Sequence, residues 1–429
     1  MIYFLIFILM FEMIFVYLIN KRRILSPTLI ACGMFLLSLI IYAFYKNNYY
    51  GRDLQSNIIF IVPVLILFMC LGEKIAWKIN FFKEKQEKEE KIIEIKSYLI
   101  FIFSVFTLIS GILYFIDVYK FSLLVGNSAG NFFTMTEYVR HASNYGSGKL
   151  TYSPPTLISQ LNIISECIVY TCIFSFVKDF LKFGVKYKKL LFPCIGYILY
   201  IAACDSRGNL IRNITIIAII IFGLLLENKT NVKKTNKKIL KIGILFLLIF
   251  FVVFRILGYR TGTSYNYSWS TNIAKYVSSG IYGLDEYLLD GPIKNNLFGE
   301  STFRLIYLKL NDFGATFNVL DANDVFYQYA KGESNIYTGL KGIINDFSVF
   351  GAGVFLMIWS MLSVCAVKAM QNKKCTLMNC VVTGLLFYPI VMISISVEWR
   401  NVLSIPTIYM LFYLTLLSIL IRKSERYIA

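Results

Sequence analysis

Six arginines lie at the ends of apolar runs or in the segments between them, a placement that suits the binding of an anion. They are Arg207, Arg212, Arg255, Arg260, Arg304 and Arg400. A guanidinium group forms paired, charge-assisted hydrogen bonds with phosphate. A charged side chain close to hydrocarbon is costly and tends to be paired or to face a cavity. Snorkelling to the membrane surface is the alternative for any single arginine. Together, the six predict a site for a lipid-linked phosphate or diphosphate.

The sequence contains no cluster of metal ligands. Its nine cysteines lie mostly inside apolar runs, as Cys70, Cys172 and Cys194 do, and His141 is the single histidine. Zinc and iron–sulfur sites need several Cys or His residues close together. We therefore expect no metal and no other cofactor, and we interpret the cysteines as small apolar core residues.

The composition determines which elements must position these charges. The chain has 429 residues, of which 57% are hydrophobic and 16% are charged. Apolar runs of roughly 17–22 residues alternate with charged clusters, and about 20 such residues form a helix that crosses a bilayer. A backbone in lipid must satisfy its own hydrogen bonds, so these runs must be helices. A soluble globular domain and a β-barrel are both excluded.

The formal charge of +18 follows from membrane topology and does not require a nucleic acid. Basic residues concentrate in short segments on one predicted side, as the positive-inside rule requires. No nucleic-acid-binding motif accompanies them, so we expect no nucleic-acid partner. The run at Lys83–Lys96 alternates Glu with Lys, which is typical of a solvated helix and is the alternative to a docking site for a cytoplasmic partner.

The hydropathy pattern predicts an all-α, multi-pass membrane protein with about eleven transmembrane helices in one membrane domain, residues 1–429. Met1 to Asn20 lacks a basic leader and a small-residue cleavage site, so we expect it to stay as the first crossing. Basic residues follow it, which predicts an N-terminus outside and a C-terminus inside. The predicted helices are 2–19, 27–45, 57–75, 98–116, 157–177, 190–204, 210–226, 242–257, 346–367, 377–396 and 401–421.

Two predicted outer segments, residues 117–156 and 258–345, are much longer than ordinary loops, which rarely exceed about 15 residues unless they are functional or disordered. The second is rich in aromatic residues, unlike disordered chains. It also has apolar residues at helical spacing, namely Phe303, Ile306, Tyr307 and Leu310. We expect a folded cap on the outer face of the membrane. An interfacial aromatic belt is the alternative explanation for its rings.

Several short motifs, taken in order along the chain, are similar to a known family. The stretch Asn335-Ile-Tyr-Thr338, followed by Asn345-Asp-Phe-Ser348 at the start of a long helix, resembles a pattern of the Wzy-type polymerases of O-antigen and capsule repeat units. Ser206-Arg207-Gly208, Tyr259-Arg260-Thr261-Gly262 and Gly299-Glu-Ser-Thr-Phe303 resemble its other landmarks. Ser348 replaces the usual glycine. Because only glycine accepts a positive φ freely, the conformation of this turn is left open.

This resemblance implies a glycosyltransferase-C-like fold and a reaction outside the cytoplasmic membrane of a bacterium. A growing glycan is transferred from undecaprenyl diphosphate to the sugar of a second lipid-linked repeat unit, without a metal or a nucleotide sugar. The implied partners are undecaprenyl-diphosphate-linked oligosaccharides, membrane lipid, and the chain-length regulator and flippase of the same pathway.

The residue chemistry assigns roles within such a reaction. Arg207 and Arg260 are the first candidates for the diphosphate, because preplaced cations stabilise a leaving phosphate. Further substrate-binding candidates are Arg304, Arg400 and Tyr337. The attacking sugar hydroxyl needs a general base, and the candidates are Asp346, Asp205, Glu300 and His141. Each of three candidates has a structural alternative. Asp346 could cap the helix that follows it, Asp205 could pair with Arg207, and His141 could have a structural role.

Three alternatives stay open. A ligase of the same pathway would use the same donor with another acceptor. A flippase would be non-catalytic, and the large cap and the odd number of helices argue against it. A membrane acyltransferase usually relies on histidine, and His141 is the single histidine of the chain.

Overall fold

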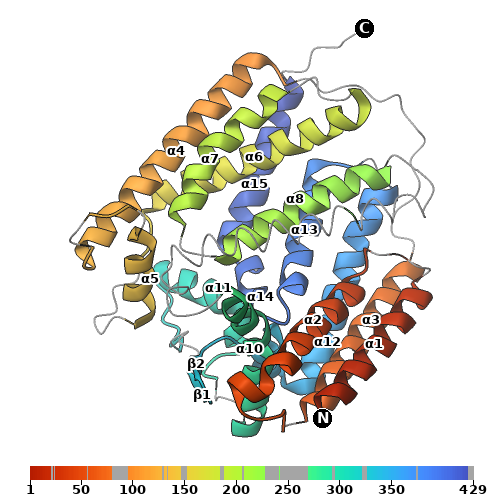
Figure 1. Cartoon of the computed structure of the whole chain (residues 1–429). Coiled ribbons are helices and arrows are strands. Elements are labelled where there is room, and N and C mark those ends of the chain that lie inside the picture. Colours follow the sequence, from red (N-terminus) through yellow and green to blue (C-terminus); the bar gives the residue numbers. More distant parts are fainter. Residues whose placement is uncertain are drawn as a thin grey trace.

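The computed structural model describes residues 1–20, 23, 25–55, 57–79, 95–127, 130–132, 134–145, 152–183, 188–204, 207–227, 241, 269–291, 295–320, 326–372 and 375–423. Most of them are helical (Figure 1). Among these residues, seven helices are long and apolar enough to cross a membrane: α1 (Ile2–Ile19), α2 (Pro27–Tyr45), α3 (Ile58–Lys78), α4 (Ser97–Leu124), α6 (Thr156–Phe183), α8 (Arg207–Glu227) and α12 (Gly339–Asn372). The chain is therefore an all-α protein of the multi-pass membrane class.

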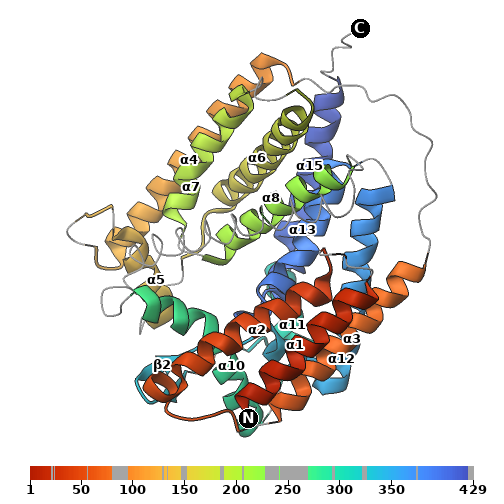
Figure 2. The ribbon, with the colours of Figure 1, turned by 45° about the vertical axis from the view of Figure 1, so that its right-hand side comes forward.

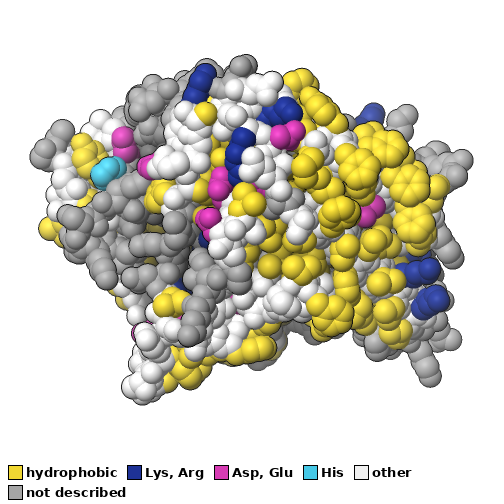
Figure 3. Space-filling view, turned by 90° about the horizontal axis from the view of Figure 1, so that it is seen from below, with side chains coloured by type: hydrophobic (Ala, Val, Ile, Leu, Met, Phe, Trp, Pro, Cys, Tyr) yellow, Lys and Arg dark blue, Asp and Glu magenta, His cyan; other side chains and the backbone are white. Residues whose placement is uncertain are grey.

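The surface of these helices is apolar, as contact with lipid requires. Phe4, Phe7 and Phe11 are exposed on α1, and α4 exposes Phe101, Ile102 and Ile109. On the face seen in Figure 3, hydrophobic side chains cover a broad continuous area on the right-hand side. Exposed apolar patches of this extent in a folded chain mark surfaces that another apolar phase covers.

Seven of the eleven predicted helices correspond to these long helices. Three more correspond to helices outside this set: α7 (Phe192–Ala203), α13 (Leu377–Val391) and α15 (Ile405–Lys423). α7 has 12 residues, so it extends about 18 Å and is shorter than a hydrocarbon core of about 30 Å. The predicted helix 242–257 lies outside the described residues. The count of eleven crossings therefore stays a prediction.

Several predicted boundaries are wrong. The helix expected from residue 346 begins at Gly339, because the polar residues before 346 are helical and pack in the protein interior. α4 continues to Leu124, and α5 (Met135–Tyr145) forms within the predicted first outer loop. The last predicted helix is divided into α14 (Trp399–Val402) and α15, with a break at residues 403–404.

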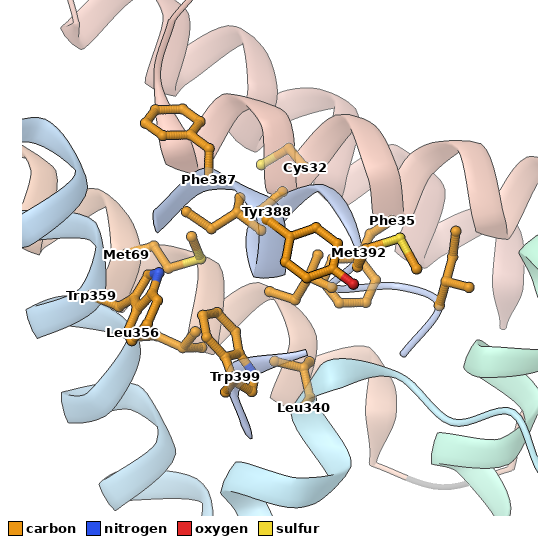
Figure 4. Close-up of a cluster of buried hydrophobic side chains, with 14 of the residues drawn as sticks. Cys32, Phe35, Met69, Leu340, Leu356, Trp359, Phe387, Tyr388, Met392 and Trp399 are labelled. Atoms are coloured by element: carbon orange, nitrogen blue, oxygen red, sulfur yellow. The ribbon is translucent and has the colours of Figure 1, made fainter. Parts of the chain in front are cut away.

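α2, α3, α12, α13 and α14 share one buried core. Figure 4 shows Phe35, Met69, Trp359, Tyr388 and Trp399 meeting in it from these five helices. α3 and α12 lie backbone to backbone at Gly72, where a Cβ atom would stand 2.1 Å from the carbonyl oxygen of Met357. Close approach at small residues is a common way for membrane helices to gain packing contacts.

At the end of the bundle away from the N-terminus, two cations from other segments, Arg23 and Lys368, contact the end of α3. The Arg23 guanidinium stacks 3.5 Å from the Trp77 ring centroid. The Lys368 ammonium on α12 donates to the carbonyl oxygens of Ala76, Trp77 and Ile79, at 3.2, 3.3 and 2.5 Å. A cation there satisfies carbonyl groups that the end of a helix leaves unpaired. The start of α2 and the ends of α3 and α12 therefore lie on the same side.

The opposite end carries the described part of the predicted cap, residues 269–291, 295–320 and 326–338. It comprises α10 (Trp269–Asp290), α11 (Glu300–Asp312) and an antiparallel hairpin of β1 (Tyr327–Tyr329) and β2 (Gly332–Ser334), in which Tyr327 pairs with Ser334. Figures 1 and 2 place α10 and the hairpin beside the N-terminal end of α1 and the end of α2. The sequence did not predict the hairpin, because its strands have only three residues each.

The hairpin attaches to the bundle through η1 (Lys46–Tyr50), a π-helical turn after α2. The N–H groups of Ala330 and Lys331 donate to the carbonyl oxygens of Tyr50 and Tyr49. Around this joint, buried tyrosine rings contact one another; they are Tyr42, Tyr49, Tyr50, Tyr282, Tyr327, Tyr329 and Tyr337. Four of these rings, Tyr282, Tyr327, Tyr329 and Tyr337, belong to the described cap, so part of its aromatic content forms a packing core.

A salt bridge reinforces the same joint. Arg52, between η1 and α3, donates to Asp285 at 2.9 Å and to Glu286 at 2.6 Å on α10. Its guanidinium also lies 4.7 Å from the centroid of the Tyr282 ring. The cap is thus bound to the membrane helices by charge pairs, ring contacts and backbone hydrogen bonds together.

Candidate functional site

The site begins where α11 meets α12. Asp346 accepts hydrogen bonds on Oδ1 from the Ser301 N–H (3.0 Å) and on Oδ2 from the Thr302 N–H (2.7 Å) and hydroxyl (2.6 Å). The first N–H groups of a helix have no partner within the helix, and a carboxylate there satisfies them and the positive end of the dipole. Asp346 thus caps α11. The sequence alternative, a cap on its own following helix, is wrong.

A chain of hydrogen bonds leads to the same carboxylate. The Tyr287 hydroxyl donates to Asn345 Oδ1 at 3.0 Å, Asn345 Nδ2 donates to Asn295 Oδ1 at 2.6 Å, and Asn295 Nδ2 donates to Asp346 Oδ1 at 2.8 Å. Burial, and then the charge of Asp346, raises the pKa of Tyr287 to about 12. Its hydroxyl therefore stays protonated and keeps donating. We call Tyr287, Asn295, Ser301, Thr302, Asn345 and Asp346 the Asp346 network.

The turn after Asp346 has the backbone that glycine would favour. Ser348 has φ 62° and ψ 175°, and it is the one non-glycine residue with positive φ in the described part of the chain. This conformation costs of order 1–3 kcal/mol for a residue with a side chain. It kinks α12 directly after Phe347, whose ring contacts Phe298 and Phe303. Ser348 therefore adopts, under strain, the backbone conformation that glycine would favour at this turn.

Glu300, at the start of α11, is buried and holds the loops on both sides of this helix. Its Oε2 accepts from the N–H groups of Asn296 (2.8 Å) and Leu297 (3.3 Å), and its Oε1 accepts from the Leu320 N–H (2.5 Å). The preceding Gly299 has φ 60°, and a Cβ atom there would lie 2.6 Å from the Phe303 ring. The oxygens of Glu300 and Asp346 are therefore occupied by structural donors, which weakens their candidacy as general bases.

A second polar group, not assigned as a site from the sequence, lies inside the membrane body. Nη2 of Arg212, on α8, is 2.9 Å from both carboxylate oxygens of Glu166 on α6. The Tyr170 hydroxyl lies 2.5 Å from Glu166 Oε1 and from Asn213 Oδ1, and Asn213 Nδ2 donates to the Tyr197 hydroxyl at 3.1 Å. We call Glu166, Tyr170, Tyr197, Arg212 and Asn213 the Glu166 network.

Ionisable residues within transmembrane segments are rare and usually functional. Among the residues that the structure describes, Arg212 Nε is buried without a hydrogen-bond partner. The guanidinium therefore retains a donor after its pairing with Glu166. Arg212 was one of the six arginines expected to bind an anion. The signal for Glu166 was available as a lone acidic residue in an otherwise apolar run.

α13 and α14 lie between the two networks. Tyr388 is buried on α13, which contacts both α8 and α14. Glu398, at the start of α14, accepts from the Ser396 hydroxyl and the Asn401 amide, both at 2.5 Å. The buried Trp399 indole donates to the Gly339 carbonyl oxygen at 3.2 Å, which ties α14 to the start of α12, and α11 packs on α14.

The other predicted site residues are distributed as follows. Arg304 and Arg400 are half-buried, on α11 and α14. Tyr337 is buried, and the Lys341 ammonium lies 3.3 Å from its ring centroid. Arg207 starts α8, but its side chain lies outside the described residues, as do Asp205 and Arg260. His141 is exposed on α5, which packs against α4, so the structure does not bring it to the Asp346 network.

The described residues contain no group of three or more His, Cys, Asp or Glu side chains placed to hold a metal ion. What the arrangement offers is cations near the end of a membrane body, with carboxylates that fix the backbone around them. Such a site can bind and orient a phosphate-bearing lipid. We compared the chain with protein-family models, with curated proteins and with solved structures, and none of the three comparisons found a match.

Proposed function

We propose that this protein is a glycosyltransferase of the cytoplasmic membrane of a bacterium, which polymerises oligosaccharide repeat units carried on undecaprenyl diphosphate. The reaction takes place on the outer face. The hydroxyl of an acceptor sugar attacks the anomeric carbon of the donor glycan, and the bond between that carbon and the diphosphate oxygen breaks. The hydroxyl proton passes to a general base, and undecaprenyl diphosphate leaves with the bonding electrons.

One observation carries the proposal. Two of the motifs that resemble the polymerase family, Gly299–Phe303 and Asn345–Phe347, are separated by more than forty positions in the sequence. In the structure they are joined directly, because Asp346 caps the helix that starts in the first motif and Phe347 contacts Phe303. If the motifs matched the family only by chance, there would be no reason for them to contact each other in the structure.

The networks favour particular roles in this reaction. Arg304 and Arg400 are half-buried on α11 and α14, which pack together, and Arg212 lies on α8. A diphosphate needs such preplaced charges as its leaving group develops negative charge. Asp346 and Glu300 act as positioning residues. Asp205 and His141 stay candidates for the general base, together with Glu166, which pairs with Arg212, and Glu398 at the start of α14.

Deletion of the gene from the producing cell tests the proposal. The expected result is loss of the glycan ladder on a gel, with single repeat units retained on the lipid carrier. Complete loss of surface sugar with lipid-linked units trapped inside would indicate a flippase instead. Accumulation of long chains on undecaprenyl diphosphate would indicate a ligase. An unchanged ladder would contradict any role in this pathway.

A further inference from the structure

The predicted apolar stripe of α11 is covered by protein at one end only. Phe303, near the start of the helix, packs against Phe347 with 6.4 Å between ring centroids. Leu310 and Phe313, at the other end of the stripe, are exposed, and Phe313 exposes 73% of its surface. The stripe of an amphipathic helix is normally turned toward an apolar neighbour. Here the side chains at its C-terminal end stay exposed.

Two further rings extend this surface. Phe298, which is 75% exposed, contacts Phe347 at 5.4 Å, and the exposed Phe317 contacts Tyr307 at 5.1 Å. We call Phe298, Leu310, Phe313 and Phe317 the α11 edge. Four large apolar side chains are thus exposed within twenty positions around one helix, and exposed apolar groups gathered in this way can mark a binding surface.

The α11 edge continues the lipid-facing surface of the membrane helices. α11 contacts α12 and α15. Phe350, on α12, is 71% exposed and follows the kink at Ser348, and Ile408 and Phe412 are exposed on α15. Lipid that covers the exposed faces of α12 and α15 would therefore reach α11 as well.

The polar groups of this segment are satisfied internally, so it does not depend on water for them. Asn311 Nδ2 donates to the Phe317 carbonyl oxygen and its Oδ1 accepts from the Phe317 N–H, both at 2.8 Å. The Tyr307 hydroxyl donates to the Phe298 carbonyl oxygen at 2.7 Å. Lys309 pairs with Asp312 at 2.8 Å. Leaving such groups unpaired would be costly in a region poor in water.

We infer that the α11 edge is immersed in the interface of the bilayer, between α12 and α15, and that its occupant is lipid. An amphipathic helix at this depth places its aromatic and aliphatic side chains at the boundary of headgroups and acyl chains. The hairpin has the opposite character, since Gln328 and Glu333 are exposed and hydrogen-bonded to each other at 3.0 Å. We therefore place the α11 edge in lipid and the hairpin in water. This holds whichever reaction the protein catalyses.

Tryptophan fluorescence in vesicles containing phosphatidylcholine brominated near the top of its acyl chains tests this placement. Phe313→Trp adds a reporter on the α11 edge, and the matched control Gln328→Trp adds one on the hairpin. The signal of the four native tryptophans is subtracted with the wild-type protein. We expect the brominated lipid to remove most of the fluorescence added at position 313 and none of that added at position 328.

Equal lack of quenching at both positions would overturn the inference. Blue-shifted but unquenched emission at position 313 would also overturn it, because it would indicate a protein partner. Both substituted side chains are exposed, so neither variant disturbs the core. Phe317→Trp provides a second reporter at the same depth, and the same result is expected there.

Discussion

Asp346 holds the first turn of α11 through Thr302, whose backbone N–H and hydroxyl both donate to the same carboxylate oxygen, at 2.7 and 2.6 Å. This contact joins two distant motifs of the sequence. Substitution of Asp346 can distinguish two roles, because loss of a general base removes activity alone, whereas loss of a helix cap also lowers stability.

Asp346→Asn is expected to reduce polymer formation and stability together. An amide supplies one acceptor oxygen in place of two, and an unsatisfied buried donor costs about 1–3 kcal/mol. Thermal unfolding in detergent and the glycan ladder measure the two effects. Thr302→Val removes one of the same hydrogen bonds without touching the carboxylate, and it should give a weaker form of the same defect. Asp346→Asn with normal stability and no activity would identify a catalytic base instead.

Ser348→Gly should stabilise the protein by about 1 kcal/mol, because it releases strain of order 1–3 kcal/mol against a smaller entropic cost in the unfolded chain. Ser348→Ala keeps the side-chain penalty and should bring no gain. The midpoint of thermal unfolding in detergent, measured on both variants, decides the matter. Equal behaviour of the glycine and alanine variants would show that the backbone at this kink is unstrained.

Glu166→Gln should destabilise the protein by about 3–5 kcal/mol, since it leaves the buried Arg212 charge unpaired. Replacement of both partners, as Glu166→Leu with Arg212→Met, should restore much of that loss, because apolar pairs substitute well for buried ion pairs. The double variant should nevertheless form no polymer. Full activity of a stable double variant would show that the pair only supports the fold.

Acid should weaken the joint between α1, η1 and α3. Burial alone would raise the pKa of Asp53, but hydrogen bonds from Lys46 and from the Leu54 N–H outweigh it and hold the pKa below its usual range. The ionised Asp53 therefore contributes fully to the folding stability above the unfolded pKa of about 3.9. This contribution is lost as the pH falls through the lower folded pKa. Asp53→Asn should lower the unfolding midpoint at pH 7, and the difference from wild type should vanish in strong acid. A difference independent of pH would contradict this.

Much of the fold follows from the sequence because hydrocarbon imposes one rule on every long apolar run. That rule identifies α1–α4, α6, α8 and α12 without any tertiary information. It fails where polar residues are helical in the interior, as at the start of α12. It predicts the helix at α7 but not that this helix has only 12 residues. It also gives no signal for a three-residue hairpin, which is stabilised by tyrosines from distant parts of the chain.

The site could be predicted only in part. The sequence places Asp346 and Glu300 in motifs, but their partners are backbone N–H groups, which carry no sequence signal. Arg212 stands out as a charge near a helix end, yet its pairing with Glu166 depends on how α6 and α8 pack. Positive φ at Ser348 is visible only in the backbone, although the glycine expected there pointed to the right position.

Reconstitution of the purified protein with one undecaprenyl-diphosphate-linked repeat unit, isolated from the producing cell, distinguishes polymerisation from transport. We expect chains of two and more repeat units, with one undecaprenyl diphosphate released for each new glycosidic bond and no requirement for a nucleotide sugar. Single repeat units that stay single, while the protein moves them across the bilayer or leaves them unchanged, would contradict it.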